Sequence, residues 1–224
     1  KFEGFNNNKI LFICNKNPRK LLSEVASRFY KLKPRNIIAV TGTNGKTSIA
    51  NFYYQILTLN NKKSAAIGTL GVLSKKFNLK TNNTSIDPVN IHKILKKLKE
   101  LKIDNVILEA SSHGLKQHRL DNINFNTALF TNLSRDHLDY HKTFKDYLNS
   151  KLILFNKLLQ NKGNIIFDDK ITQAKQLNNI LKKRKLKKYS FGTEKSFINI
   201  INIQKINNQK KIDFSINKKI YSFK

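Results

Sequence analysis

One stretch, IIAVTGTNGKTSIAN at residues 37–51, constrains the fold of this chain more than any other. Its first residues are apolar or β-branched and predict a short buried strand. GTNG at 42–45 predicts a tight turn, and an amphipathic helix is expected from Lys46 to about Leu59. Such a turn binds phosphate, because backbone N–H groups and the helix N-terminus attract its oxygens. Lys46 would reach the outer phosphates, and Thr47 would bind Mg²⁺.

The loop is tighter than the general phosphate-loop motif, since Val40 stands where that motif has its first glycine. A chance Gly-Lys-Thr in a lysine-rich sequence is therefore an alternative. The strand before the loop and the helix after it argue against chance, because this context is what distinguishes a phosphate-binding loop.

Beyond the loop, segments with strand and helix patterns alternate, which predicts a mostly parallel, doubly wound α/β sheet. Strands are expected at 64–69, 105–110, 125–131 and 164–167, and helices at 19–30, 89–101, 143–160 and 172–181. Residues 74–88 are polar and predict a long loop. From about residue 187 the apolar residues alternate with period two, and the phase changes at Ile200–Ile201. This pattern predicts a small antiparallel appendage of hairpins with one bulge.

The first part of the chain is expected to belong to another domain. It contains a short strand at 9–14 and the helix at 19–30, followed by Lys33-Pro34-Arg35 as the junction. The sequence contains no methionine, even at its start, which predicts a piece of a longer protein. We therefore expect residues 1–33 to be the tail of a preceding domain and 34–224 to be one further domain.

The formal net charge of +29 has two interpretations. One is a protein that binds nucleic acid or another polyanion. The other is a lysine-rich composition, and it is favoured because the lysines are spread over helix faces and only 182–188 forms a dense run. Specific nucleic-acid binding is not expected, although salt-sensitive adsorption to polyanions is.

The sequence also predicts a cytoplasmic protein. It has no run of 18 apolar residues and no signal peptide, so membrane insertion is not expected. The single Cys14 cannot form an internal disulfide, which fits a reducing compartment.

Polar residues follow the strands at their carboxyl ends, where such sheets bind ligands. Glu109 ends the strand at 105–110 and leads into SSHGLKQHR, and the strand at 125–131 leads into TNLSRDHLDYH. A glutamate at the end of a buried strand needs a partner or a cation. A carboxylate beside a phosphate loop suits a Mg²⁺-nucleotide site, and the alternative is a surface or capping acid.

These strings, GTNGKT, LEASSHGLKQHR and FTNLSRDHLDYH, with a lysine ten residues beyond His141, resemble the Mur ligase family and, within it, the tripeptide synthetases. The resemblance covers residues 34–224, which correspond to the central ATP-binding domain of that family. GTNGKT alone is shared with folylpolyglutamate and cyanophycin synthetases, whereas the two longer strings are more specific.

The resemblance implies a monomeric, ATP-dependent amide ligase. The terminal glutamate carboxylate of UDP-MurNAc-L-Ala-D-Glu would attack the γ-phosphate to form an acyl phosphate. The amine of a diamino acid, either meso-diaminopimelate or L-lysine, would then displace phosphate. The amino-acid-binding C-terminal domain of the family has no counterpart here, so these residues alone are expected to bind ATP without forming product.

The resemblance also implies the site residues. The ATP phosphates would contact Gly42, Thr43, Asn44, Gly45, Lys46, Thr47 and Ser48, with Asn132 near the nucleotide. Two Mg²⁺ ions are implied, one bound by Thr47 and Glu109 and the other by His137. Lys46, His137 and Lys151 would be catalytic, and Lys151 corresponds to a lysine that is carbamylated in the family and so becomes a metal ligand. From the sequence alone, a solvated lysine would be the default for Lys151.

The substrate would contact Asn83, Thr84, Ser85, Ser111, Gln117 and Arg119. Ser85 replaces a threonine of the family, and Ile86 stands where proline or glycine is common, which puts the geometry of that loop in question. Two alternatives remain open: a ligase similar to folylpolyglutamate synthetase, and a basic nucleotide- or nucleic-acid-binding module.

Overall fold

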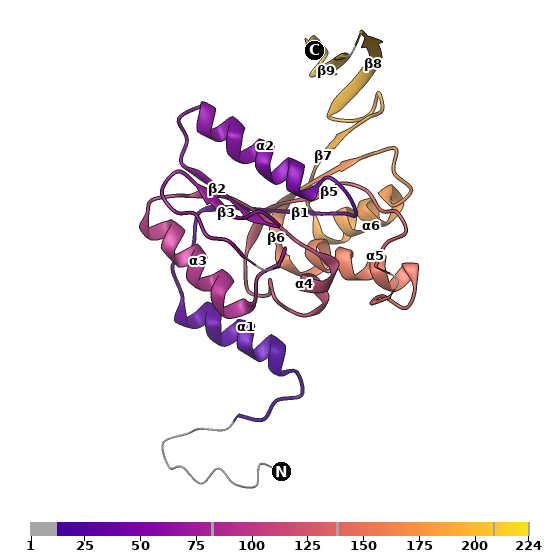
Figure 1. The fold of residues 1–224 in the computed structure, drawn as a ribbon. Helices are drawn as coiled ribbons and strands as arrows, with labels where there is room; N and C mark the ends of the chain where they lie inside the picture. The colour runs from indigo at the N-terminus through magenta and orange to yellow at the C-terminus, as the bar shows by residue number, and fades with distance from the viewer. Residues whose placement is uncertain (1–12, 82, 138, 208, 224) are drawn as a thin grey trace, which may run out of the picture.

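A ten-stranded mixed sheet runs through the protein in the order β10-β9-β8-β7-β6-β5-β1-β4-β2-β3 (Figure 1). The structure is a computed structural model, and it describes residues 13–223 except 82, 138 and 208. The strands are β1 (Asn36–Thr41), β2 (Ser64–Gly68), β3 (Gly71–Ser74), β4 (Asn105–Glu109), β5 (Phe125–Phe130), β6 (Leu159–Asp168), β7 (Lys187–Phe191), β8 (Ile198–Ile206), β9 (Gln209–Ile216) and β10 (Lys219–Phe223).

The centre of the sheet is parallel, as the sequence predicts. Strands β2, β4, β1, β5, β6 and β7 pair side by side in the same direction. Strand β3 pairs antiparallel with β2, and β8, β9 and β10 form an antiparallel meander. The bulge predicted near Ile201 is confirmed, because the register shifts between Ile200 and Asn202.

The start of the appendage differs from the prediction. The period-two segment from residue 187 begins with β7, but β7 is parallel to β6 and belongs to the main sheet. Helix α6 (Ala174–Arg184) returns the chain to the starting end of β6, so the next strand must run in the same direction. The antiparallel part therefore begins at β8, and it extends away from the main body in Figure 1.

Helices lie on both faces of the sheet (Figure 1). Helix α2 (Lys46–Leu59) covers one face and buries Ala50 against Val40 and Ile107. The opposite face carries the larger core, built from α3 (Pro88–Glu100), α5 (Phe144–Ile153) and α6. Alternation along β1 produces this division, because Ile37 and Ala39 face the larger core while Val40 faces α2.

Two further helices complete the described part. Helix α1 (Pro18–Phe29) packs against α3 on the outside of the domain, and α4 (Ser112–Lys116) is a short turn that follows β4. None of the helices in the described part of the chain has both the length and the apolar character needed to cross a bilayer.

Most predicted elements agree with the structure to within a few residues, with four exceptions. The helix expected at 143–160 ends at Ile153, continues as a π-helical turn, η1 (Leu154–Leu158), and gives way to β6 at Leu159. Strand β3 begins within the turn after β2, and α4 was not predicted. The strand expected at 9–14 lies largely outside the described residues, and Ile13 and Cys14 are not in a strand.

Candidate active site

The loop of residues 42–48 connects β1 to α2 at the carboxyl end of the parallel strands. Its two glycines are required by geometry. Gly42 has a φ of 144°, and a Cβ there would lie 1.8 Å from the Thr131 hydroxyl oxygen. Gly45 has a φ of 85°, in the left-handed region that favours glycine. The loop is therefore pressed against the segment that follows β5.

Asn132 holds the shape of this loop. Its backbone oxygen accepts a hydrogen bond from Thr43 N at 2.9 Å, and its side-chain oxygen accepts one from Asn44 N at 3.0 Å. The Thr131 hydroxyl donates to the Asn44 oxygen at 2.7 Å. The segment after β5 thus fixes the loop through side chains and backbone together.

The Lys46 ammonium group lies beside the loop. It donates to the Gly42 oxygen at 3.0 Å and to the Thr43 oxygen at 2.7 Å. Burial lowers the pKa of Lys46, although the carboxylates of Glu109 and Asp136 act to raise it. This cation and the N-terminus of α2 create positive potential where phosphate oxygens would bind.

Glu109 is buried at the end of β4 and contacts the start of α2. The Thr47 hydroxyl donates to its Oε2 at 2.8 Å, and Thr69 contributes its backbone N–H at 2.9 Å and its hydroxyl at 3.2 Å. A Cβ at Gly68 would lie 2.1 Å from Glu109 Oε1, so a glycine is required at that position. With 2% of its surface exposed, Glu109 is neither a surface acid nor a helix cap. A carboxylate with a hydroxyl beside it is a suitable oxygen pair for Mg²⁺.

Lys151 is not a solvated lysine. It is 1% exposed, and its Nζ donates to the Gly42 oxygen at 2.7 Å. The same nitrogen lies 4.4 Å from the centre of the Tyr147 ring, and the Tyr147 hydroxyl is 3.1 Å from the Thr43 hydroxyl. Burial, with the charge of Lys46, lowers the pKa of Lys151 to about 7. A large fraction of this amine is therefore neutral and nucleophilic at neutral pH.

His137 lies among aromatic rings. Its half-exposed ring makes edge contacts with His113, at 5.0 Å between ring centres, and with Tyr147, at 6.1 Å. Within the described ranges, no three His, Cys, Asp or Glu side chains lie close enough together to hold a metal ion. A site built from Thr47, Glu109, His137 and Lys151 would thus depend on a modified lysine and on oxygens of the nucleotide.

The Ser85 hydroxyl is fully used inside the protein. It donates to the Glu109 backbone oxygen at 3.1 Å and accepts from the Ser111 backbone N–H and hydroxyl, both at 3.0 Å. One donor and two acceptors are the whole capacity of a hydroxyl. Ser85 therefore fixes its loop, and the buried Ile86 anchors the same loop in the larger core.

The two residues before Ser85 continue this loop from Glu109 toward the surface. The Thr84 hydroxyl lies 3.0 Å from the hydroxyl of Thr69, which bonds Glu109, and Asn83 is exposed. The loop therefore extends from the carboxylate out to the surface.

Arg119 and Gln117 form a second part of the candidate site. Arg119 donates from Nε at 3.0 Å and from one terminal nitrogen at 2.7 Å to the Gln117 side-chain oxygen. Its other terminal nitrogen donates to the Ser85 backbone oxygen at 2.9 Å. These three bonds leave two of the five guanidinium N–H groups without a partner among the described residues.

Two residues of this site were missed by the sequence reasoning. Thr69 directly follows β2, so the same rule that singled out Glu109 at the end of β4 would have found it. Tyr147 gives no such signal, because its contacts to Thr43 and Lys151 depend on how α5 packs under the loop.

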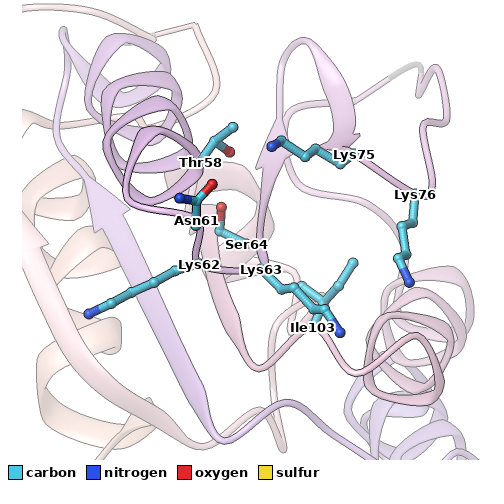
Figure 2. Close-up of a pocket in the computed structure, with 8 residues that line it drawn as sticks. All are labelled: Thr58, Asn61, Lys62, Lys63, Ser64, Lys75, Lys76 and Ile103. Atoms are coloured by element: carbon cyan, nitrogen blue, oxygen red, sulfur yellow. The ribbon is translucent and has the colours of Figure 1, made fainter.

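A separate cavity of about 210 Å³ lies at the opposite end of β2 (Figure 2). It is lined by residues of α2, of β2 and of the loops before β2, after β3 and before β4, and four of them are lysines: Thr58, Asn61, Lys62, Lys63, Ser64, Lys75, Lys76 and Ile103. None of the residues expected in the site lines this cavity. Its surplus of lysines reflects the composition of the whole surface.

Known proteins are similar to this chain over most of its length. A family model described as the Mur ligase middle domain matches residues 40–224. A UDP-N-acetylmuramoyl-L-alanyl-D-glutamate–2,6-diaminopimelate ligase from Rickettsia bellii (strain RML369-C) is 39% identical over 225 aligned residues, covering 96% of this chain and 46% of that protein. The chain spans about a third to a half of the length of the curated relatives it matches.

Solved structures share the fold. That of a UDP-N-acetylmuramoyl-L-alanyl-D-glutamate–2,6-diaminopimelate ligase superimposes with a TM-score of 0.81 at 24% identity, over 95% of this chain and 44% of that chain. Folylpolyglutamate synthase from Mycobacterium tuberculosis, complexed with ADP and AMPPCP, gives 0.69 at 13% identity, over 92% of this chain and 53% of that chain.

Proposed function

Because the chain belongs to the Mur ligase family, we propose that it forms the ATP-binding part of a ligase that adds a diamino acid to UDP-MurNAc-L-Ala-D-Glu. The observation that carries this proposal is the hydrogen bond between Thr47 and the buried Glu109, beside the glycine loop. The Rickettsia bellii relative, similar over nearly the whole chain, is a diaminopimelate ligase, which supports diaminopimelate as the diamino acid.

The residues at the loop fit Mg²⁺-ATP as a substrate. The loop N–H groups and the N-terminus of α2 would hold the phosphate oxygens, and Lys46 would stabilise the negative charge that develops on the transferring γ-phosphoryl group. Bound Mg²⁺ would neutralise part of the phosphate charge. Thr47 and Glu109 would hold one ion through oxygen, and Glu109 is kept in position by Thr69.

We also propose that Lys151 acts as a carbamate. Its neutral amine would attack CO₂, form an N–C bond and release one proton, so a buried cation would become an anionic oxygen ligand. The pKa of about 7 supports this step because the neutral amine is the reactive form. With His137, the carbamate would hold the second of two Mg²⁺ ions.

The substrate carboxylate would approach from the Gln117–Arg119 side. Arg119 has N–H groups available for a carboxylate, and Ser111, Asn83 and Thr84 lie on the segments around it. The rigid, hydrogen-bonded Ser85 would keep these segments at a fixed distance from Glu109. Proximity of the carboxylate to the γ-phosphate is the main contribution expected of these residues.

The division of the chain is part of the same proposal. Residues 34–224 would form the central ATP-binding domain, and 1–33 would be the tail of a preceding domain. This division is supported by the family match from residue 40 and by the packing of α1 on α3, outside the sheet. A folate ligase is not favoured, because the folylpolyglutamate synthase shares the fold at only 13% identity.

A chimera tests the proposed function. Residues 1–224 replace the matched region of the Rickettsia bellii ligase, and tripeptide formation from ATP, UDP-MurNAc-L-Ala-D-Glu and diaminopimelate is followed by mass spectrometry. We expect product with this substrate and none with folate. A folded chimera that binds ATP but ligates glutamate to folate, or forms no tripeptide, would contradict the proposal. Lys46→Ala in the same chimera is the matched inactive control.

A further inference from the structure

A cavity of about 250 Å³ lies beside the Gln117–Arg119 pair, and α1 forms one of its walls. Helix α1 contributes Arg19 and Leu22, the loop before α3 contributes Asn83, and the segment after α4 contributes Gln117 and Arg119. Two guanidinium groups from segments far apart in sequence thus line the same cavity. Sequence patterns gave no role to Arg19.

The position of α1 relative to this cavity is fixed by polar contacts. The Asn17 side-chain nitrogen lies 3.0 Å from His118 Nε2, and His118 Nδ1 lies 2.8 Å from an Asp121 carboxylate oxygen. The Ser23 hydroxyl donates to the Asp121 backbone oxygen at 2.8 Å. These contacts on both sides of Arg19 attach α1 to His118 and Asp121, which lie on either side of Arg119 in the sequence.

The charge of the cavity is positive. The one carboxylate that lines it, Asp87, caps α3 and accepts from the Asn90 backbone N–H at 3.0 Å and from the Asn90 side chain at 2.8 Å. Arg19 is exposed and makes no ion pair among the residues that the structure describes. Together with the two available N–H groups of Arg119, its planar guanidinium suits a carboxylate or phosphate, which accept paired hydrogen bonds.

We propose that Arg19 is a substrate-recognising residue, which together with Arg119 forms a site for an anionic group of the muramoyl-peptide nucleotide. The proposal rests on the function proposed above and extends its substrate site onto α1. The cavity is linked to the Thr47–Glu109 pair. Asn83, which lines the cavity, precedes Thr84, and Thr84 contacts Thr69, which bonds Glu109. The anion is either a peptide carboxylate or the pyrophosphate of UDP.

Binding measurements on the whole chain test this proposal. The probes are UDP-MurNAc-L-Ala-D-Glu, MurNAc-L-Ala-D-Glu, UDP and the ATP analogue AMPPCP, titrated into wild type, Arg19→Gln, Arg19→Lys and Lys20→Gln. Lys20 is the matched control, because it loses one charge from the same exposed turn without lining the cavity. Thermal unfolding confirms that each variant is folded.

Arg19→Gln should weaken binding of UDP-MurNAc-L-Ala-D-Glu by about tenfold or more, with Arg19→Lys intermediate, because one charge-assisted bidentate contact is lost. AMPPCP binding should stay within about twofold of wild type, as should all binding by Lys20→Gln. Loss with MurNAc-L-Ala-D-Glu assigns the anion to the carboxylate, and loss with UDP assigns it to the pyrophosphate.

Three results would overturn the role of Arg19: equal affinities in Arg19→Gln and wild type, equal losses in Lys20→Gln, or a wild type that binds AMPPCP but none of the substrate probes. A wild type that fails to bind AMPPCP would instead contradict the nucleotide site itself.

Discussion

Replacing Lys151 by methionine should remove much of the pH dependence of folding stability between pH 7 and 9. In the folded chain the pKa of Lys151 is lowered from 10.5 to about 7, chiefly by burial. Below pH 7 the folded and unfolded chains both carry the proton, and the folded chain bears the full cost of a buried charge. Between pH 7 and 10.5 the unfolded chain binds more protons, so stability rises with pH.

The magnitude follows from the two pKa values. The change from 10.5 to about 7 corresponds to roughly 5 kcal/mol of differential interaction between the charged and neutral forms. About 2–3 kcal/mol of this should appear as added stability on going from pH 7 to pH 9. Methionine has a similar length and no charge, so it should fill the space under the loop without this dependence.

Urea denaturation at pH 7 and pH 9, in CO₂-free buffer, measures this effect. Wild type should gain stability over that interval, and Lys151→Met should gain much less. Lys145→Met, on the exposed side of the same helix, is the control and should behave as wild type. Equal pH dependence in wild type and Lys151→Met would refute the reasoning, because Lys151 would then not be buried as a titrating amine.

Four further predictions follow from the same geometry. Lys151→Ala in the chimera should abolish ligation, with partial rescue by acetate, and an unmodified amine in the mass spectrum of the active, Mg²⁺-bound protein would contradict the carbamate. Glu109→Gln should raise the Mg²⁺ concentration required for ATP binding about tenfold, by loss of an anionic ligand; an unchanged requirement would remove Glu109 from the metal site. His92 is buried without a hydrogen-bond partner in the described part of the chain, and burial lowers its pKa to about 4, so His92→Leu should raise the urea midpoint. The gain should be larger at pH 5, where the unfolded chain binds a proton that the folded chain excludes; a lower midpoint would show a hidden partner. The chain by itself should hydrolyse ATP slowly at most and form no tripeptide, because none of the site residues proposed above binds the amine of the diamino acid. Tripeptide detected by mass spectrometry would disprove this.

Local sequence patterns predicted the parallel sheet and the glycine loop well. The order strand, GTNG turn and helix depends on residues 36–59 alone, and β1 and α2 agree with the predicted ranges. Strand β3 and the π-helical turn η1 depend instead on pairing with β2 and on burial of Leu154 and Phe155. Tertiary packing determines the secondary structure of such segments. Their sequences alone therefore predicted a loop in place of β3 and a continued helix in place of η1.

Some residues of the candidate site could likewise be predicted from local sequence, and others depend on tertiary packing. Glu109 stands at a strand end, and its contact with Thr47 follows from the topology of a parallel sheet. The burial of Lys151 could not be derived from its position on α5, since it depends on Tyr147 and the Gly42 carbonyl meeting from different elements. Arg19 is a similar case, because its position near Arg119 depends on tertiary contacts of α1, among them the polar contacts of Asn17 and Ser23.

Calorimetric titration of the chain with ATP, with and without Mg²⁺, tests the central claim most directly. We predict binding that requires Mg²⁺ and weakens about tenfold or more in Lys46→Ala, because a charge-assisted contact to phosphate is lost. Lys75→Ala, in the cavity of Figure 2, should bind as wild type. The claim would be contradicted if the affinity for ATP did not depend on Mg²⁺ or Lys46 but decreased in Lys75→Ala. ATP would then be held by surface charge and not by the loop.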